Sequence, residues 1–116
     1  MSTKTDMAKV RKFCEDREWD QFHNPKDLAI GLSTESNELL DIFRFKSEEQ
    51  MARLLTELAS REHISEELAD IYFFLLRFCQ RHDFDLEQCL EDKIRKNAAK
   101  YPVEKFRGKN EKYNEL

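Results

Sequence analysis

The 116-residue sequence contains only two glycines and two prolines. A loop that binds phosphate through its backbone needs several closely spaced glycines, so this scarcity argues against P-loop and Rossmann-type nucleotide sites. Folds with many tight β-turns also use glycine repeatedly, which argues against a small barrel or sandwich. The length suits one domain of ~100–150 residues, and we expect a single domain over residues 1–116.

Other absences bear on partners and location. No stretch approaches about 18 consecutive apolar residues, so no membrane partner is expected. The net charge of −4 gives no broad attraction for a nucleic acid polymer. Cys14, Cys79 and Cys89 form an odd set without a C-x-x-C pair, which is typical of buried thiols in a reducing cytoplasm. We therefore predict that all three cysteines are buried and unpaired. Residues 1–12 lack the apolar core of a secretory signal, so we also predict a cytoplasmic location.

What the sequence does contain is apolar residues at helical spacing, with 40% apolar content and nine phenylalanines to build a core. This pattern predicts an all-α fold, a bundle of four to five helices. A polar tail over residues 103–116 is expected to be extended, docked on a neighbour or partly disordered. The helices are expected at about 5–17, 25–43 or 25–45, 48–58, 61–81 and 85–101.

Capping residues mark three of these helix starts. Asn24 is a typical N-cap, and Pro25 follows it at the first helical position, where its missing N–H costs nothing. The capping-box pattern, in which a side chain and a backbone N–H three residues apart bond reciprocally, occurs twice. It covers residues 47–50 and 85–88.

Carboxylates occupy unexpected positions on the two long predicted helices. At about 100° per residue, Glu35 falls within the apolar arc of its helix and Glu38 lies on the flank of that arc. Glu67 falls within the apolar stripe of the later helix, and Asp70 lies beside it on the same face. Each helix therefore directs an acidic i, i+3 pair toward the interior, where an unpaired carboxylate is costly.

Three ordinary explanations stay open for such acids: a rotated helix that turns them to solvent, pairing with Lys or Arg, or a helix end that water reaches. The recurrence of the pair on two successive long helices favours a bound cation instead. Oxygen ligands without an adjacent His or Cys favour Mg²⁺, with Mn²⁺ as a substitute. No glutamate precedes a histidine by three residues, which argues against a di-iron site.

A magnesium ion held by carboxylates suits phosphate chemistry, because it neutralises charge on phosphate oxygens and lowers the pKa of a bound water. A nucleotide also needs an aromatic platform for its base. For each candidate the alternative is ordinary packing in the core. The candidates are Trp19, Phe22, His23, Phe45 and Phe74.

The two acidic pairs are followed, in order, by the motif K-x-x-x-N-x-x-K-Y-P at residues 93–102. On this basis nearly the whole chain resembles the MazG-type all-α nucleotide pyrophosphohydrolases, in particular their dCTP pyrophosphatase subgroup. The other segments that carry the resemblance are residues 17–28, 35–39, 43–46, 66–72 and 112–116.

The resemblance implies a reaction, a cofactor and an assembly. The reaction is hydrolysis of a nucleoside triphosphate, dCTP or a modified dCTP, to the monophosphate and pyrophosphate, as in cleansing of the nucleotide pool. The implied cofactor is Mg²⁺. The implied assembly is a homodimer or homotetramer whose helical core is completed by dimerisation.

The resemblance also implies roles for particular residues. The expected metal ligands and catalytic acids are Glu35, Glu38, Glu67 and Asp70. The residues expected to contact phosphate or sugar are Lys93, Asn97, Lys100 and Tyr101. The expected base pocket, formed partly across a subunit boundary, consists of Trp19, His23, Phe45 and Phe74.

The sequence departs from the family pattern at three places. Thr34 stands where the broader family often carries Glu, which leaves the general base unassigned, with Glu38 and Glu66 as candidates. Phe45 and Phe74 replace Trp and Tyr of some relatives and so lack an N–H and an O–H. The same reaction on dUTP or on a broad set of dNTPs therefore stays open. A non-catalytic helical interaction module is the alternative from another class of protein.

Overall fold

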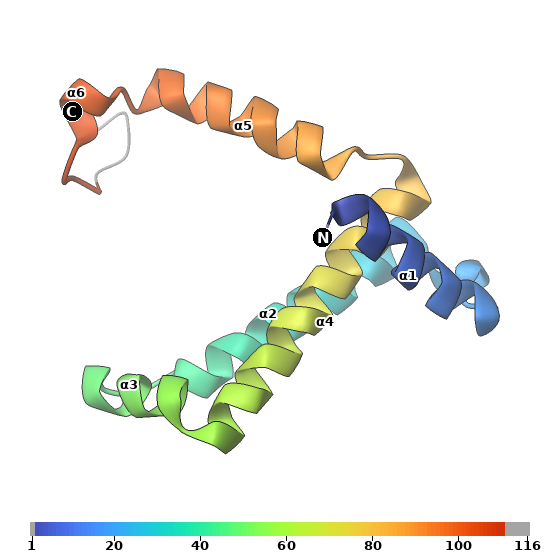
Figure 1. Ribbon diagram of the computed structural model, residues 1–116, viewed down its shortest axis with the longest axis horizontal. Helices are drawn as coiled ribbons and strands as arrows, with labels where there is room; N and C mark the ends of the chain where they lie inside the picture. The colour runs from blue at the N-terminus through green and yellow to red at the C-terminus, as the bar shows by residue number, and fades with distance from the viewer. Residues whose placement is uncertain (1, 111–116) are drawn as a thin grey trace. The chain divides into compact units, whose positions relative to one another are not determined.

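The computed structural model describes residues 2–110, which form six α-helices and one 3-10 turn and contain no strand (Figure 1). The predicted all-α class is confirmed. The elements are α1 (Thr3–Asp16), η1 (Asp20–Phe22), α2 (Pro25–Phe43), α3 (Glu48–Thr56), α4 (Leu58–His82), α5 (Leu86–Lys100) and α6 (Val103–Phe106).

These helices separate into two compact units, one that ends at Asp83 and one that begins at Phe84. The first unit holds α1 to α4, and the second holds α5 and α6. A single domain over the whole chain stays a prediction. Residues 112–116, one of the segments that carry the family resemblance, lie outside the described residues.

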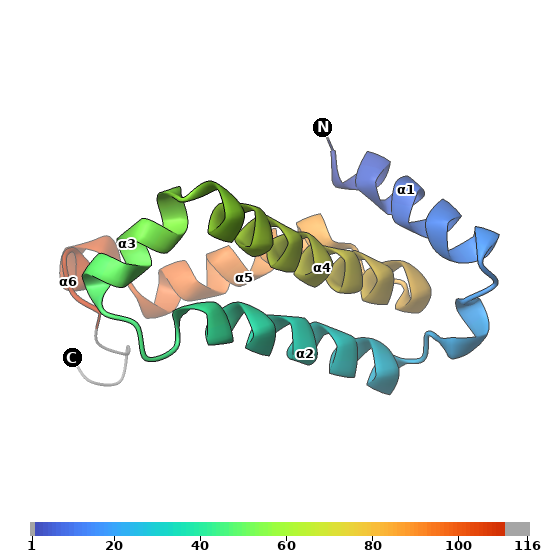
Figure 2. The same ribbon diagram turned by 90° about the horizontal axis from the view of Figure 1, so that it is seen from below.

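The centre of the first unit is the pair formed by α2 and α4. These helices lie side by side and run in opposite directions, because α3 turns the chain between them (Figure 2). Helices α1 and α3 both pack on α4. The buried apolar side chains of the unit are Cys14, Leu28, Ile64, Leu76 and Cys79.

The predicted caps explain where several helices begin. The Asn24 side chain accepts a hydrogen bond from the Asp27 N–H at 2.8 Å, which starts α2. Ser47 and Gln50 form a complete capping box, with hydrogen bonds of 2.8 and 3.1 Å. At the start of α5 the Asp85 side chain caps the helix, but the side-chain amide of residue 88 donates to Asp92 Oδ1 at 3.0 Å instead.

Two expectations need correction. The extended conformation predicted for the tail is wrong at its start, because Val103–Phe106 is a short helix. Pro102 cannot continue α5, but its φ of −58° suits the start of a new turn, and the Phe106 ring packs on Tyr101 with centroids 4.8 Å apart. The second correction is Cys89, which is exposed on α5, whereas Cys14 and Cys79 are buried as predicted.

None of the helices within residues 2–110 combines the length and the apolar character that a bilayer crossing requires.

Close approach of α2 and α4 depends on Gly31. A Cβ atom at this position would lie 2.4 Å from Cε1 of Phe74, well inside van der Waals contact. The missing side chain therefore creates the space that the Phe74 ring fills, and it places this aromatic ring against the backbone of α2.

We expect Gly31→Ala to destabilise the protein by about 1–2 kcal/mol. Overpacking against the ring costs roughly 1–3 kcal/mol, and the better helix propensity of alanine recovers up to about 1 kcal/mol. Urea unfolding measures the difference. The double variant with Phe74→Leu should recover most of the loss, since the two positions are in contact. A gain in stability for Gly31→Ala alone would show that the ring is not held there.

Candidate active site

The structure brings three of the four predicted acids together. Glu35 and Glu38 on α2 face Glu67 on α4, and one carboxylate oxygen from each lies within 4.8 Å of the others. The i, i+3 spacing on α2 places the first two on one face of that helix. Glu67 is buried, with 7% of its surface exposed, while Glu38 is exposed.

Asp70, the fourth predicted acid, lies outside this three-residue cluster and is exposed. Its negative charge nevertheless contributes to the raised pKa of Glu35, so it belongs to the same electrostatic neighbourhood. A role for Asp70 as a metal ligand stays a prediction.

The crowding of carboxylates changes the proton affinity of Glu35. The pKa of Glu35 rises from 4.5 to about 7, first through a hydrogen bond to Glu67, then through burial and through a hydrogen bond and charge repulsion from Glu38. Like charges at this range disfavour simultaneous ionisation. Below about pH 7 a proton on Glu35 relieves this repulsion, and a bound cation would relieve it as well.

Glu67 shows that the cluster fits a metal ion. Its Oε2 atom is buried and has no hydrogen-bond partner among residues 2–110, and its Oε1 atom lies 3.5 Å from Nε2 of His63. Burial of a carboxylate oxygen without a partner costs folding free energy, and a bound cation would offset that cost. Hard divalent cations such as Mg²⁺ and Mn²⁺ prefer carboxylate oxygens, and the three clustered acids supply them.

A cleft of about 640 Å³ opens beside the acids. Besides Glu38 and Glu67, it contains two side chains that can carry positive charge, Lys46 and His63. Its full lining is Glu38, Asp41, Ile42, Lys46, Leu54, Ser60, His63 and Glu67. The volume lies within the range of roughly 300–1,000 Å³ usual for small-molecule sites.

Lys46 and His63 are not among the site residues that the sequence predicts. The available signals were indirect: His63 lies four residues before Glu67 and so on the same face of α4, and Lys46 closes the matching segment 43–46. These signals alone do not distinguish the two residues from ordinary cations on the surface. The distinction needs the positions of α3 and α4, which form the cleft.

Three of the four predicted base-pocket residues belong to one chain of aromatic contacts. His23, Trp19, Phe13, Phe73 and Phe74 contact one another in that order, edge to face, with centroid separations of 6.1, 5.6, 5.8 and 5.6 Å. The alternative in which Phe22 packs in the core is wrong, since its side chain is exposed.

Phe45, the fourth base-pocket residue, lies just beyond the opposite end of α2. This helix has 19 residues and so spans about 28 Å, which separates Phe45 from His23 within one chain. Phe45 is 89% exposed, so core packing is wrong here too. Its φ of 63° is a left-handed conformation that bulky residues rarely adopt, and the Arg44 guanidinium lies 4.8 Å from its ring centroid.

The residues predicted to contact phosphate or sugar belong to the second unit. Lys93, Asn97 and Lys100 lie on α5 at spacings that place them on one face, and Tyr101 caps that helix. Their role stays a prediction.

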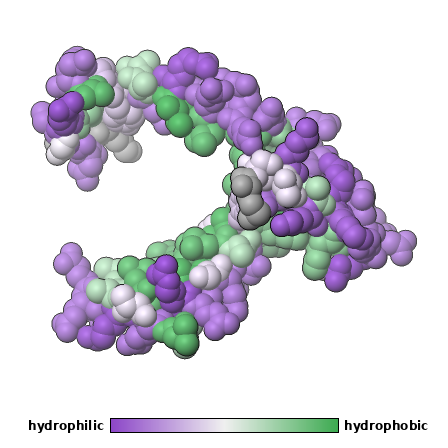
Figure 3. Space-filling model, viewed as in Figure 1, coloured by the Kyte–Doolittle hydropathy of each residue, from purple (hydrophilic) through white to green (hydrophobic). Residues whose placement is uncertain are grey.

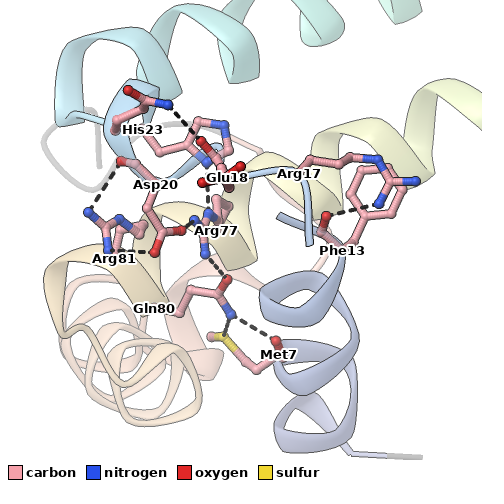
Figure 4. Close-up of polar contacts among 10 residues, drawn as sticks. Met7, Phe13, Arg17, Glu18, Asp20, His23, Arg77, Gln80 and Arg81 are labelled. Carbon is pink, nitrogen blue, oxygen red and sulfur yellow. Dashed lines mark hydrogen bonds and ion pairs between the residues drawn. The ribbon is translucent and has the colours of Figure 1, made fainter. Parts of the chain in front are cut away.

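Arg77 of α4 is fully buried, which no local sequence pattern predicts. Its guanidinium donates hydrogen bonds to Asp20, His23 and Gln80 (Figure 4). The hydrogen bond from Arg77 holds the pKa of Asp20 below its usual value. Burial, and then the charge of Arg77, lower the pKa of His23. One predicted base-pocket residue is thus bonded to a buried cation.

Residues 30–116 match the family described as MazG-like. The chain belongs to the MazG-like family. The resemblance inferred from the sequence is therefore confirmed.

Named relatives agree with the family. The chain is 33% identical to dCTP pyrophosphatase 1 of Mus musculus and 34% identical to that of Bos taurus, over 105 residues that make up 90% of this chain. The matched part is 62% of the length of these relatives. A crystal structure of a pyrophosphatase from Archaeoglobus fulgidus is 31% identical, with a TM-score of 0.79 over 85% of this chain and 91% of that one.

The raised pKa of Glu35 predicts that the metal-free protein loses stability as pH rises. A carboxyl group whose pKa is raised by folding stabilises the fold below its ordinary pKa of 4.5, and this contribution is lost as pH rises through about 7. In EDTA, we expect the melting temperature to fall by about 5 °C between pH 5.5 and 8, the shift that roughly 1 kcal/mol produces in a small domain.

Two variants identify the group responsible. Glu35→Gln keeps a hydrogen-bonding side chain without a titrating proton and should flatten the profile. Glu62→Gln changes an exposed acid on the same pair of helices and should leave the profile as it is. A metal-free profile that Glu35→Gln does not alter would contradict the assignment.

Proposed function

We propose that the chain is an Mg²⁺-dependent hydrolase that converts a deoxynucleoside triphosphate, dCTP or a modified dCTP, and water to the monophosphate and pyrophosphate. The observation that carries the proposal is the cluster of Glu35, Glu38 and Glu67 beside a cleft, in a chain of the MazG-like family. The names of the dCTP pyrophosphatase relatives support the choice of substrate.

The acids would hold the metal ion. Glu35, Glu38 and Glu67 would bind it, with Asp70 as the further predicted ligand. A bound Mg²⁺ neutralises charge on phosphate oxygens and makes a water molecule more acidic. The unpartnered Oε2 atom of Glu67 supports this role, because the ion would supply its missing partner.

The chain's own cations would bind the phosphates. Lys46 and His63 line the cleft next to the acids, so they would contact phosphate oxygens that project from the metal site. We also retain Lys93, Asn97, Lys100 and Tyr101 of the second unit as phosphate or sugar contacts. The general base stays unassigned between Glu38 and Glu66.

The position of Phe45 supports a base pocket shared between two copies of the chain. Phe45 lies at the end of α2 remote from Trp19 and His23, and its ring is almost fully exposed. A homodimer, or a homotetramer made of two dimers, would allow a second copy to supply this ring to the pocket. Stacking on an aromatic face is favourable for any nucleobase.

Exposed apolar side chains support the same assembly. Leu40, Leu58 and Leu68 on α2 and α4 are 57%, 84% and 51% exposed. Apolar side chains reach the surface among hydrophilic ones in the space-filling view (Figure 3). Exposed large apolar side chains are a feature of protein interfaces, and a second copy would bury them.

Pyrophosphate release from a panel of dNTPs tests the function. We expect release with Mg²⁺ and loss of release in EDTA. Glu67→Gln should lower the rate by at least about 100-fold, the lower end of losses when a group that stabilises transition-state charge is removed. Glu62→Gln, at an exposed position of α4, serves as the matched control.

Ligand-induced stabilisation separates this enzyme from a non-catalytic helical module. With Mg²⁺ and a nucleotide at about 100 times its Kd, the native state should gain about 2.7 kcal/mol, visible as a rise in melting temperature. A protein that gains nothing with any dNTP and releases no pyrophosphate is not the proposed enzyme. Equal rates on dUTP and dCTP would contradict a preference for cytosine and favour the alternative of a broader substrate range.

Phe45→Ala tests the shared pocket. Because this side chain is almost fully exposed, we expect helicity and melting temperature to change little. KM for dCTP should rise about tenfold, which corresponds to about 1.4 kcal/mol and lies within the roughly 1–3 kcal/mol of one stacking contact. Analytical ultracentrifugation should give the mass of a dimer or tetramer. A monomer with unchanged KM in the variant would exclude the contribution of a second copy.

A further inference from the structure

Arg77 is the most buried charged side chain of the first unit, and it connects three elements (Figure 4). From α4 its Nη2 atom donates to Asp20 Oδ1 on η1, and its Nη1 atom donates to Gln80 Oε1 at 2.7 Å. Gln80 in turn donates to the Met7 carbonyl of α1 at 2.8 Å. A buried guanidinium is costly unless its donors are bonded, so these contacts hold it in one orientation.

The remaining contact of this guanidinium is to His23. Nε of Arg77 donates to Nδ1 of His23 at 2.8 Å. A guanidinium can only donate, so Nδ1 has to be the unprotonated acceptor. In a neutral imidazole the proton then resides on Nε2. The geometry thus selects one of the two neutral tautomers of His23.

The charged groups around His23 also favour its neutral form. Arg77 and Arg81 from α4 face it, and both disfavour a second positive charge, while Asp20 from η1 acts in the opposite direction. Asp20 is already bonded to Arg77, and Arg81 lies 3.8 Å from its Oδ2 atom. A protonated His23 would place an N–H group against the donor of Arg77 and lose their hydrogen bond.

We propose that Arg77 is a positioning residue that holds His23 as the neutral Nε2–H tautomer, so that His23 donates a hydrogen bond to an acceptor on the nucleobase. The inference rests on the proposed function, because it takes Trp19 and His23 as base-pocket residues. The acceptor is a carbonyl oxygen or an unprotonated ring nitrogen, and cytosine offers both. The neighbouring Trp19 ring, 6.1 Å from the imidazole centroid, supplies the aromatic surface of the same pocket.

Nitrogen NMR of the full chain with ¹⁵N-labelled histidine reads the tautomer without any enzyme assay. In the wild type we expect the proton of His23 on Nε2 and an unprotonated Nδ1. In Arg77→Met the two tautomers should mix, because the donor to Nδ1 is gone. Arg81→Met is the matched control: it removes a cation that faces His23 and contacts Asp20 but does not donate to Nδ1 of His23, so the His23 tautomer should stay that of the wild type.

Kinetics separate positioning from a merely structural role. For Arg77→Met we expect KM for dCTP to rise about tenfold, the effect of losing one hydrogen bond, with kcat within about twofold of the wild type. KM for 2-deoxyribose 5-triphosphate, which has no base, should stay unchanged. Equal rises for both substrates, or the same rise in Arg81→Met, would overturn the positioning role.

A second pair of variants decides the matter if Arg77→Met does not fold. The amide nitrogen of His23→Gln reaches the place of Nε2, whereas that of His23→Asn reaches the place of Nδ1. We expect the Gln variant to keep the lower KM for dCTP, and the reverse order would overturn the proposal. If the wild type releases no pyrophosphate from any dNTP, both the function and this inference fall. If it does, and Arg77→Met binds dCTP normally, only the inference falls.

Discussion

Mutual repulsion among Glu35, Glu38 and Glu67 is the constraint that the α2–α4 pair has to satisfy. The three carboxylates face one another across these helices, with Glu67 buried. The apolar contacts around them and the close approach at Gly31 hold the helices together in spite of this repulsion. A proton on Glu35 or a divalent cation relieves the repulsion, so occupancy of the site and stability of the helix pair are linked.

Near the C-terminal end of α4, the first unit contains a buried positive charge instead of buried negative ones. Arg77 is a buried cation, and it is matched within the chain by the carboxylate of Asp20 and by the neutral acceptors of His23 and Gln80. Within residues 2–110, Oε2 of Glu67 has no such partner. The α4 helix thus carries a buried cation that its own chain pairs, and a buried carboxylate oxygen that the described part of the chain leaves unpaired.

Helical periodicity and capping chemistry predicted much of this arrangement, because both act over a few residues. The inward placement of Glu35 and Glu67 follows from 3.6-residue spacing, and the start of α2 follows from its cap. Arg77 could not be predicted in this way, since its partners Asp20 and His23 lie more than 50 residues away in sequence. The cleft residues likewise depend on how α3 turns back onto α4. The sequence also does not show whether an apolar side chain is buried within its own chain or left exposed on its surface.

The backbone conformation of Phe45 lowers stability, whereas its proposed role needs an aromatic ring at that position. Its left-handed backbone conformation costs roughly 1–2 kcal/mol for a residue with a Cβ, and Gly or Asn would adopt it with less strain. Neither replacement carries an aromatic ring. Selection for heat resistance alone would therefore favour loss of Phe45, whereas the base-stacking role proposed for its ring would retain it. Under that proposal, thermostable variants of this chain would diverge from active ones at this position.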